Sequence, residues 1–276
     1  MRPALYICAT PIGNLQDVSF RLIETLKTVK YVLCEDTRVT RVLLSKYAID
    51  TDTISFDQFR ERRKDNWVID QMAEGHSLAL VSDAGTPCIS DPGYFIVSRV
   101  RESGFDVISV PGPSAVSALL SIAGVAVDRY VFSGFTPKRL NDWRPLCELA
   151  RQDQLPLVFF ESPHRIQLLI QWVAEWDPLA HLVLGKELTK KFEEVVSGTS
   201  EQLAGLPYRW DRGEWCGLIV FSPFQPSHNS KNVVTQLREC GCSNRQIVDI
   251  CKKVLHINKN EIYKFLLLPS EGSTDD

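Results

Sequence analysis

The sequence predicts an α/β protein with two α/β domains and a small helical module at its C-terminal end. Short runs rich in β-branched and aromatic residues alternate with helical patterns over the first 135 residues. The same alternation restarts after TPKR at 136–139, and a polar, proline-bearing stretch at 222–230 separates it from a final group of short amphipathic segments. We therefore predict domains at 1–135, 136–224 and 225–276.

In the first domain, strands are expected at residues 4–9, 31–35, 53–56, 77–82 and 106–110, with a last one at 130–135. Between the first two, Leu22, Leu26 and Val29 fall on one helical face, and Met72 belongs to a second helical pattern that Gly75 ends. Strands that alternate with helices need crossover connections. We therefore expect a largely parallel sheet with helices on both faces.

In the second domain, strands are expected at residues 157–160, 182–184, 193–197 and 218–221. A helix between the first two carries Ile166, Leu169 and Val173 on one face. Residues 187–196 leave room for only a tight turn between strands, so this sheet is predicted to be more antiparallel than the first.

Residues 225–276 are predicted to form a linker, a helical module and a disordered tail. Amphipathic patterns place short helices at 233–239, 244–254 and 259–267, and Ser243 is suited to cap the second one. Compact helical modules of this kind bind nucleic acid in some proteins and only pack against a neighbouring domain in others.

The net charge of −3 excludes a protein coated uniformly with positive charge, so any contact with nucleic acid must be local. Two basic clusters stand out: Arg60, Arg62 and Arg63 next to aromatic residues, and Lys252 and Lys253 near the C-terminal end. Each cluster is also compatible with an ordinary solvated helix face.

No apolar run approaches the ~20 residues of a membrane span, and the N-terminal residues lead directly into a predicted strand. A cytoplasmic protein is therefore expected. The eight cysteines form no CxxC pair, which favours reduced thiols over disulfides or a metal site.

Three loops that follow predicted strands have the composition of a ligand site. They are TPIGNLQD at 10–17, SDAGTPCISDPG at 82–93 and PGPSA at 111–115. Ligands bind α/β sheets at the carboxyl ends of the strands, where glycine permits close backbone approach and a helix start offers free N–H groups. The GxGxxG and GxxxxGK[ST] fingerprints are absent, so neither a dinucleotide site nor a Walker loop is predicted.

These motifs, together with EDTR at 35–38, ESPHR at 161–165, KELTK at 186–190 and NEIYK at 260–264, resemble the tetrapyrrole methylase superfamily. Within it they are most similar to the branch that methylates small-subunit ribosomal RNA, and the resemblance covers nearly the whole chain. It implies two α/β domains of the tetrapyrrole methylase type, with S-adenosylmethionine bound in the cleft between them.

The resemblance also implies a function. The expected reaction is methylation of the ribose 2′-hydroxyl of a cytidine in the P-site region of bacterial 16S ribosomal RNA, by a homodimer. The expected partner is this RNA or the assembled 30S subunit, with no DNA, membrane or metal involved. Two alternative functions remain: a tetrapyrrole methyltransferase, and an RNA-binding protein that has lost catalysis.

The residues assigned by resemblance belong to the motifs above. Donor contacts are expected from Pro11, Asp83, Thr86, Ser114, Ala115, Phe160 and Glu161. RNA contacts are expected from Arg38, Arg60, Arg62, Arg63, Lys252 and Lys253.

Removal of the hydroxyl proton requires a group that accepts it, and the residue types leave several open. Glu187, Lys190 and Glu35 are the predicted catalytic residues, and Asp36 and Glu161 are further alternatives. Each of these side chains has a rival role in an ion pair.

Overall fold

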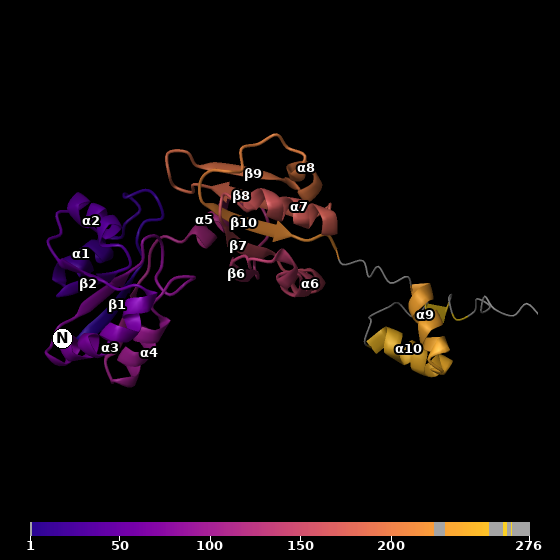
Figure 1. Cartoon of the computed structure of the whole chain (residues 1–276), viewed down its shortest axis with the longest axis horizontal. Helices are drawn as coiled ribbons and strands as arrows, with labels where there is room; N and C mark the ends of the chain where they lie inside the picture. Colours follow the sequence, from indigo (N-terminus) through magenta and orange to yellow (C-terminus); the bar gives the residue numbers. More distant parts are fainter. Residues whose placement is uncertain (1, 224–229, 254–261, 264–265, 267–276) are drawn as a thin grey trace, which may run out of the picture. The chain divides into compact units, whose positions relative to one another are not determined.

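The computed structural model describes residues 2–223, 230–253, 262, 263 and 266, and the side chains of 58–60 and 230–232 are not among those described. The chain divides into two compact units, Met1–Ser222 and Pro223–Asp276. The first unit contains two five-stranded sheets, and the second contains helices (Figure 1).

The first sheet is entirely parallel, with strand order β3-β2-β4-β1-β5. Its strands are β1 (Ala4–Cys8), β2 (Tyr31–Cys34), β3 (Asp52–Ser55), β4 (Leu78–Val81) and β5 (Asp106–Val110). The three strands that precede the predicted ligand loops, β4, β1 and β5, are direct neighbours. This order brings the three loops together at one edge of the sheet.

Helices cover both faces of the first sheet, as predicted. They are α1 (Phe20–Thr28) and α2 (Thr37–Lys46) on one face, and α3 (Gln58–Ala73) and α4 (Tyr94–Glu102) on the other. Alternation along β2 shows why both faces need cover. Val32 and Cys34 pack with Leu26 of α1, while Leu33 packs on the opposite face with Met72 of α3.

The second sheet has strand order β6-β7-β10-β8-β9. Its strands are β6 (Val131–Phe135), β7 (Leu157–Glu161), β8 (His181–Lys186), β9 (Glu194–Thr199) and β10 (Trp215–Val220). Among these strands only β6 and β7 pair in parallel, while β7–β10, β10–β8 and β8–β9 are antiparallel. This confirms the more antiparallel character expected from the tight turn predicted within residues 187–196.

One predicted boundary differs from the structure. Ending the first domain at residue 135 placed the strand at 130–135 in that domain, whereas β6 pairs with β7 in the second sheet. The chain crosses to the second sheet earlier, through α5 (Ala115–Ile122). The reason is burial: Val116 and Leu119 of α5 pack on Val158 and Val183 of the second sheet.

The opposite face of the second sheet is covered by helices α6 (Arg144–Gln152), α7 (Ile166–Trp176) and α8 (Ser200–Ala204), and the short 3₁₀ helix η1 (Leu140–Asp142) precedes α6. The predicted face of α7 is buried, with Ile166, Leu169 and Val173 fully inaccessible to solvent. The backbone of Gly217 permits close packing inside this layer, because a Cβ there would lie 2.1 Å from the ring of Phe159.

The second unit contains α9 (Ser230–Glu239) and α10 (Asn244–Lys253), close to the first two predicted helices. Val234, Ile247, Cys251 and Ile262 form its buried core. The Ser243 hydroxyl accepts a hydrogen bond from Gln246 N at 3.4 Å, as an N-cap residue does, and Ser243 N donates to the Gln246 side chain at 2.9 Å. Most of the predicted third helix, most of the polar stretch at 222–230 and the predicted tail at 269–276 lie outside the described residues. Among the helices that are described, none is long and apolar enough to cross a membrane.

Candidate functional site

The loops after β1 and β4 are joined to each other by hydrogen bonds. Thr10 N donates to Gly85 O at 2.8 Å, and Gly85 N donates back to Thr10 O at 3.1 Å. The Thr10 hydroxyl also donates to Ser82 O at 3.1 Å. Gly85 has a φ of +79°, a left-handed conformation that glycine adopts without a steric penalty. These contacts hold the two loops as one rigid wall.

The turn between β8 and β9 reaches across to the first of these loops. Asn14 N donates to the Thr189 hydroxyl at 3.1 Å. A Cβ on Gly13 would lie 2.3 Å from Cγ of Lys190 and 3.2 Å from Leu188 O, so the turn packs against Gly13 more closely than a larger residue would allow. This contact joins the edge of the first sheet to a turn of the second.

A cavity of about 490 Å³ lies where these segments meet. Its walls come from the three loops, the start of α5 and the ends of β6, β7, β8 and β10. The apolar part of the wall includes Ile12, Val116, Phe135, Phe160 and Leu188. The charged part consists of Asp83, Asp91, Glu161, Glu214 and Lys190, so the wall carries four carboxylates and one ammonium group.

The cavity gathers most of the residues that the sequence assigned to the donor. Its lining includes Asp83, Thr86, Ser114, Ala115, Phe160 and Glu161. Pro11 is buried in the first loop and does not line the cavity, whereas the adjacent Ile12 does. A strand-to-helix loop exposes only some of its side chains on the inner side, and the sequence motif does not distinguish them.

Ser114 and Ala115 place the start of α5 on the cavity wall. Ser114 occupies the N-cap position with extended backbone, yet its hydroxyl forms no capping hydrogen bond. The first N–H groups of a helix lack partners within the helix and carry a partial positive charge. This wall therefore offers a hydroxyl and backbone donors to a ligand carboxylate or hydroxyl.

The loop after β4 supplies two carboxylates with different surroundings. Asp83 is exposed, and its Oδ1 accepts a hydrogen bond from Asp36 N at 3.1 Å. Asp91 is half-buried, and burial together with the nearby charges of Glu35 and Asp83 raises the pKa of its carboxyl to about 6. The sequence motif contained Asp91, but our donor assignment from the sequence did not include it.

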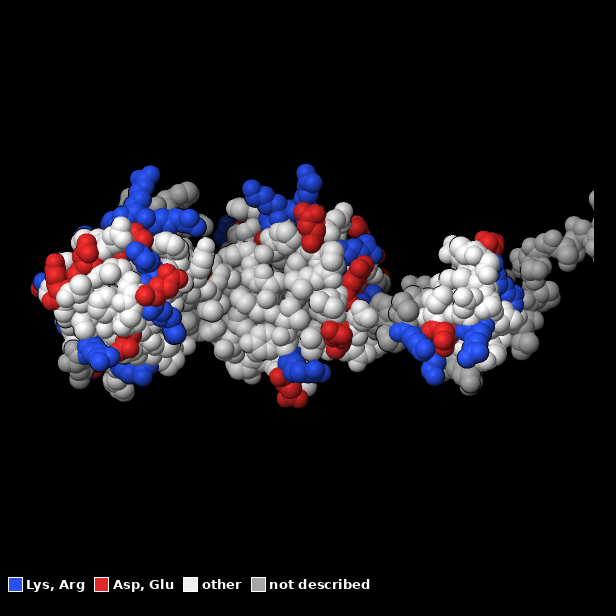
Figure 2. Space-filling view, turned by 90° about the horizontal axis from the view of Figure 1, so that it is seen from below, with Lys and Arg blue, Asp and Glu red and all other residues white. Residues whose placement is uncertain are grey.

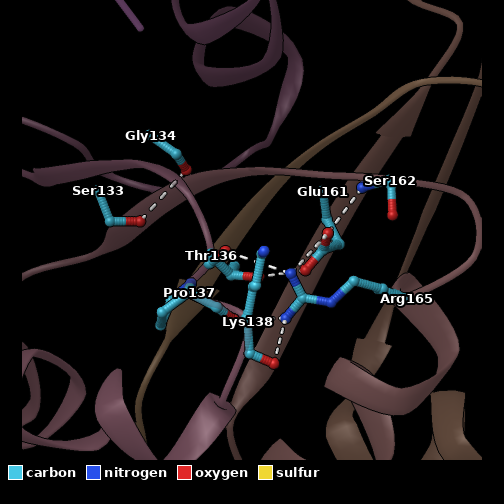
Figure 3. Close-up of polar contacts among 8 residues, drawn as sticks. All are labelled: Ser133, Gly134, Thr136, Pro137, Lys138, Glu161, Ser162 and Arg165. Atoms are coloured by element: carbon cyan, nitrogen blue, oxygen red, sulfur yellow. Dashed lines mark hydrogen bonds and ion pairs between the residues drawn. The ribbon is translucent and has the colours of Figure 1, made fainter.

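Glu161, at the end of β7, belongs to a buried polar network (Figure 3). Its carboxylate accepts from the Thr136 hydroxyl and, at 2.7 Å, from Ser162 N, and it lies 3.8 Å from the Arg165 guanidinium. Arg165 in turn donates to the carbonyl oxygens of Thr136, Pro137 and Lys138. Figure 3 shows the guanidinium between the Glu161 carboxylate and the Lys138 carbonyl. The network fixes the segment that leaves β6 against the cavity.

Lys190 and Glu187, two of the predicted catalytic residues, are paired with each other and with Glu214. The Lys190 ammonium donates at 2.9 Å to Glu187 and at 2.9 Å to Glu214. Burial lowers the pKa of Lys190, but these two carboxylates outweigh it and raise the pKa. Burial raises the pKa of Glu187, yet hydrogen bonds from Glu214 N and Lys190 lower it. Lys190 therefore remains a cation and Glu187 a weakly basic carboxylate.

Glu35, the third predicted catalytic residue, follows β2 and is not part of the cavity lining. Burial and the charges of Asp83, Asp57 and Asp36 raise the pKa of its carboxyl. Its neighbour Asp36 caps α2 and accepts from Arg38 N at 2.8 Å. Asp36 is thereby held ionised, because its hydrogen bonds with Arg38 lower its pKa to about 2.

The residues predicted to contact RNA belong to three helices, α2, α3 and α10. Arg38 has 89% of its side chain exposed and pairs with Asp36 at 2.6 Å. Arg62 and Arg63 of α3 are exposed, with the Arg62 guanidinium 5.2 Å from the centre of the Phe95 ring. The Arg60 side chain lies outside those described.

Lys252 and Lys253 lie at the exposed end of α10 in the second unit. Lys253 is 3.4 Å from Asp249 of the same helix. In Figure 2, basic side chains on the visible face of this unit are interrupted by acidic ones. Lys253 therefore lies beside an acidic side chain of its own helix.

Comparisons with known proteins agree with this architecture. The sequence profile of the Tetrapyrrole (Corrin/Porphyrin) Methylases matches residues 4–204. The chain is 36% identical to the Ribosomal RNA small subunit methyltransferase I of Neisseria meningitidis, covering 95% of this chain and 92% of that protein. It is 34% identical to the protein of the same name from Buchnera aphidicola, covering 94% of each.

A solved structure named diphthine synthase superposes with a TM-score of 0.64 at 13% identity, covering 79% of this chain and 89% of that one. At this identity the likeness concerns the fold alone. The two-sheet architecture is therefore shared beyond the ribosomal RNA enzymes.

Proposed function

The chain belongs to the tetrapyrrole methylase family, and we propose that it methylates a ribose 2′-oxygen of small-subunit ribosomal RNA, with S-adenosylmethionine as the methyl donor. It is a methyltransferase of the ribosomal RNA branch of this family, whose members use this donor. The observation that carries the proposal is the cavity between the three motif loops and the second sheet, which combines apolar walls with carboxylates.

The cavity suits this donor in size and in charge. Its volume of about 490 Å³ falls within the range of about 300–1,000 Å³ that is typical of small-molecule sites. The carboxylates of Asp83 and Asp91 favour a ligand with a positive charge, and the wall around Phe160 and Val116 favours an apolar, flat group. The unused hydroxyl of Ser114 and the start of α5 suit an amino-acid carboxylate.

When bound, the donor supplies an electrophilic methyl group on a sulfonium. The protein has to place the ribose oxygen in line with that methyl group, exclude water and accept the hydroxyl proton. The Thr136–Glu161–Arg165 network gives the site a fixed wall on the side of the second sheet. The proposed donor contacts are the six cavity residues named by the sequence, with Ile12 beside Pro11.

The finer identity of the substrate is part of the proposal. We propose a cytidine of the P-site region in 16S RNA, presented by the RNA or the assembled 30S subunit in the cytoplasm, and a homodimeric enzyme. Arg38, Arg60, Arg62 and Arg63 are proposed to contact RNA phosphates, as are Lys252 and Lys253 of the second unit. Support comes from the exposure of these side chains where they are described.

The test uses isotopically labelled donor with 30S subunits, naked 16S RNA and a porphyrinoid offered separately. We expect label in 16S RNA, and mass spectrometry of RNA fragments to locate it on one ribose. Label only on the porphyrinoid would instead establish a tetrapyrrole methyltransferase. A folded protein that binds no donor by calorimetry would establish an RNA-binding protein without catalysis. Light scattering with the same preparation checks the dimer.

A further inference from the structure

The proposed reaction needs a group that takes the proton from the ribose hydroxyl. We propose that Asp91 is this catalytic residue, an inference that rests on the proposed function of the cavity. Asp91 lies on the cavity wall in the loop after β4. Neither the family comparison nor our sequence-based assignment gives this residue a role.

The other carboxylates on the described cavity wall are already engaged. Glu161 accepts from Thr136 and Ser162 N and faces Arg165. Glu214 pairs with Lys190 at 2.9 Å and has 77% of its side chain exposed. Asp83 is exposed and accepts from Asp36 N. The lone pairs that these carboxylates use for such partners are not available to accept a proton from a substrate.

Asp91 accepts one hydrogen bond, as Asp83 does, but it differs from Asp83 in burial. It is half-buried, and the charged groups that act on it, Glu35 from the end of β2 and Asp83 from its own loop, are both acidic. Ser82 offers it one hydrogen bond, and the Cys88 thiol beside it is neutral because burial raises its pKa to about 11. Burial and like charges raise the pKa of Asp91 to about 6, close to the working pH at which a general base is most effective.

The loop holds Asp91 in a fixed position. Cys88 and Ser90 both adopt left-handed backbone conformations, with φ of 70° and 64°, which non-glycine residues adopt only when the surroundings enforce them. A Cβ on Gly134 would lie 2.9 Å from the Ser90 hydroxyl oxygen, so β6 passes directly against the loop. Beyond the loop, the buried Glu61 carboxylate accepts from Ile96 N at 2.8 Å and fixes the start of α4.

The step balances without any further reactant. The Asp91 carboxylate takes the hydroxyl proton as the ribose oxygen forms a bond to the methyl carbon. The carbon–sulfur bond breaks, and its electron pair stays on sulfur, which becomes a neutral thioether. Asp91 then returns its proton to water. One carboxylate is regenerated, and one proton is released per methyl group transferred.

The test compares Asp91→Asn, Asp91→Glu and the matched control Asp106→Asn. Asp106 is an exposed aspartate at the amino end of β5, whereas the cavity lies at the carboxyl ends of the strands. With saturating donor and RNA, we expect single-turnover methylation by Asp91→Asn to fall at least about 100-fold, with partial recovery in Asp91→Glu. The wild-type rate should rise with pH along a limb at or below about pH 6 that Asp91→Asn lacks.

A second measurement does not depend on methylation. Calorimetry at pH 6 in buffers of different ionisation enthalpy reports the protons released when donor binds. A cation next to Asp91 favours its ionised form, so the wild type should release up to about half a proton with S-adenosylmethionine and less with the uncharged thioether product. Asp91→Asn should show no such difference, while Asp106→Asn should behave as the wild type.

The outcomes separate the two levels of inference. The role of Asp91 is refuted if the Asp91→Asn variant methylates within about threefold of the wild-type rate or keeps the wild-type pH profile. Either result leaves the proposed function intact. The proposed function is refuted if the wild-type protein binds donor with the expected proton release but never labels RNA. In that case a ribose hydroxyl is not the source of the proton that Asp91 accepts.

Discussion

The two aspartates of the loop after β4 differ in exposure, and the difference decides what each can do. Asp83 is exposed on the cavity wall and also receives a hydrogen bond from Asp36 N. The charge of Asp83 is therefore available to a cationic ligand, while its Oδ1 accepts a hydrogen bond from the segment that follows β2. Asp91 is half-buried among acidic neighbours. Proximity in sequence does not reveal this distinction.

Replacing Asp83 by asparagine should weaken donor binding without unfolding the protein. The substitution keeps an oxygen that accepts from Asp36 N but removes the charge that faces the cavity. Loss of one partly exposed charge interaction is worth about 1.4 kcal/mol, or roughly tenfold in the donor dissociation constant measured by calorimetry. Asp106→Asn serves as the control. An unchanged dissociation constant would remove Asp83 from the donor site.

Replacing Asp91 by asparagine should stabilise the fold at high pH. In the folded protein the pKa of Asp91 is raised from 3.8 to about 6. The ionised side chain therefore destabilises the fold above pH 6. This penalty vanishes below about pH 4, because the carboxyl is then protonated in both the folded and the unfolded state. Since Asp91 is half-exposed, solvent screening reduces the effect to about 1 kcal/mol. Thermal unfolding should show the variant above the wild type at pH 8 and level with it near pH 3.5. A variant less stable than the wild type at pH 8 would contradict the assignment.

At the scale of elements, the first loop and the β8–β9 turn contact each other, and both contribute to the cavity lining. Gly13 permits that contact because it has no Cβ, and Thr189 and Lys190 lie against it. Lys190 then reaches Glu187 and Glu214 across the same turn. The position of one cavity wall thus depends on a glycine that contributes no side chain of its own.

Gly13→Ala should therefore loosen this junction. The added methyl group would lie 2.3 Å from Lys190 Cγ and 3.2 Å from Leu188 O, and the backbone oxygen cannot move as easily as a side chain. Overpacking of this kind costs about 1–3 kcal/mol. We expect a lower unfolding temperature together with weaker donor binding. Gly205→Ala is the control, because its nearest neighbour would be 3.7 Å away. Equal behaviour of the two variants would show that the contact is not important.

At the scale of the whole molecule, the two units have separate cores. The second unit buries Val234, Ile247, Cys251 and Ile262 among its own helices. The described residues that line the cavity belong to the first unit. An RNA role for the helical module is therefore testable separately from the proposed donor site.

Deleting residues 228–276 should leave donor binding intact and impair methylation of 30S subunits. The first unit keeps its two sheets and its cavity, while Lys252 and Lys253 are lost. Loss of two phosphate contacts should make the affinity for duplex-like RNA less dependent on salt. The slope of log RNA affinity against log salt concentration should become smaller in magnitude by about two. Donor affinity by calorimetry and subunit methylation at two salt concentrations check this. Undiminished methylation would refute an RNA role for the module.

Local patterns in the sequence were sufficient to predict the strands, the two kinds of sheet and the three ligand loops. Alternation along β2 and the helical faces of α1 and α7 follow from hydrophobic periodicity, which neighbouring residues alone determine. Resemblance then supplied the donor and the RNA. Six of the seven predicted donor residues line the cavity, all but Pro11. Four of them follow strands that end at the same edge of the first sheet, and the other two, Phe160 and Glu161, end β7 of the second sheet.

Only the tertiary structure decided what depends on distant parts of the chain. Strand order placed β6 in the second sheet, since α5 buries Val116 and Leu119 there. Ion pairing with Glu214, 24 residues away, keeps Lys190 charged. Burial beside Glu35 gives Asp91 its raised pKa. Charge state and strand neighbours depend on long-range contacts, which periodicity does not encode. The sequence by itself therefore determined which loops form the site, and the fold determined which of their side chains can accept a proton.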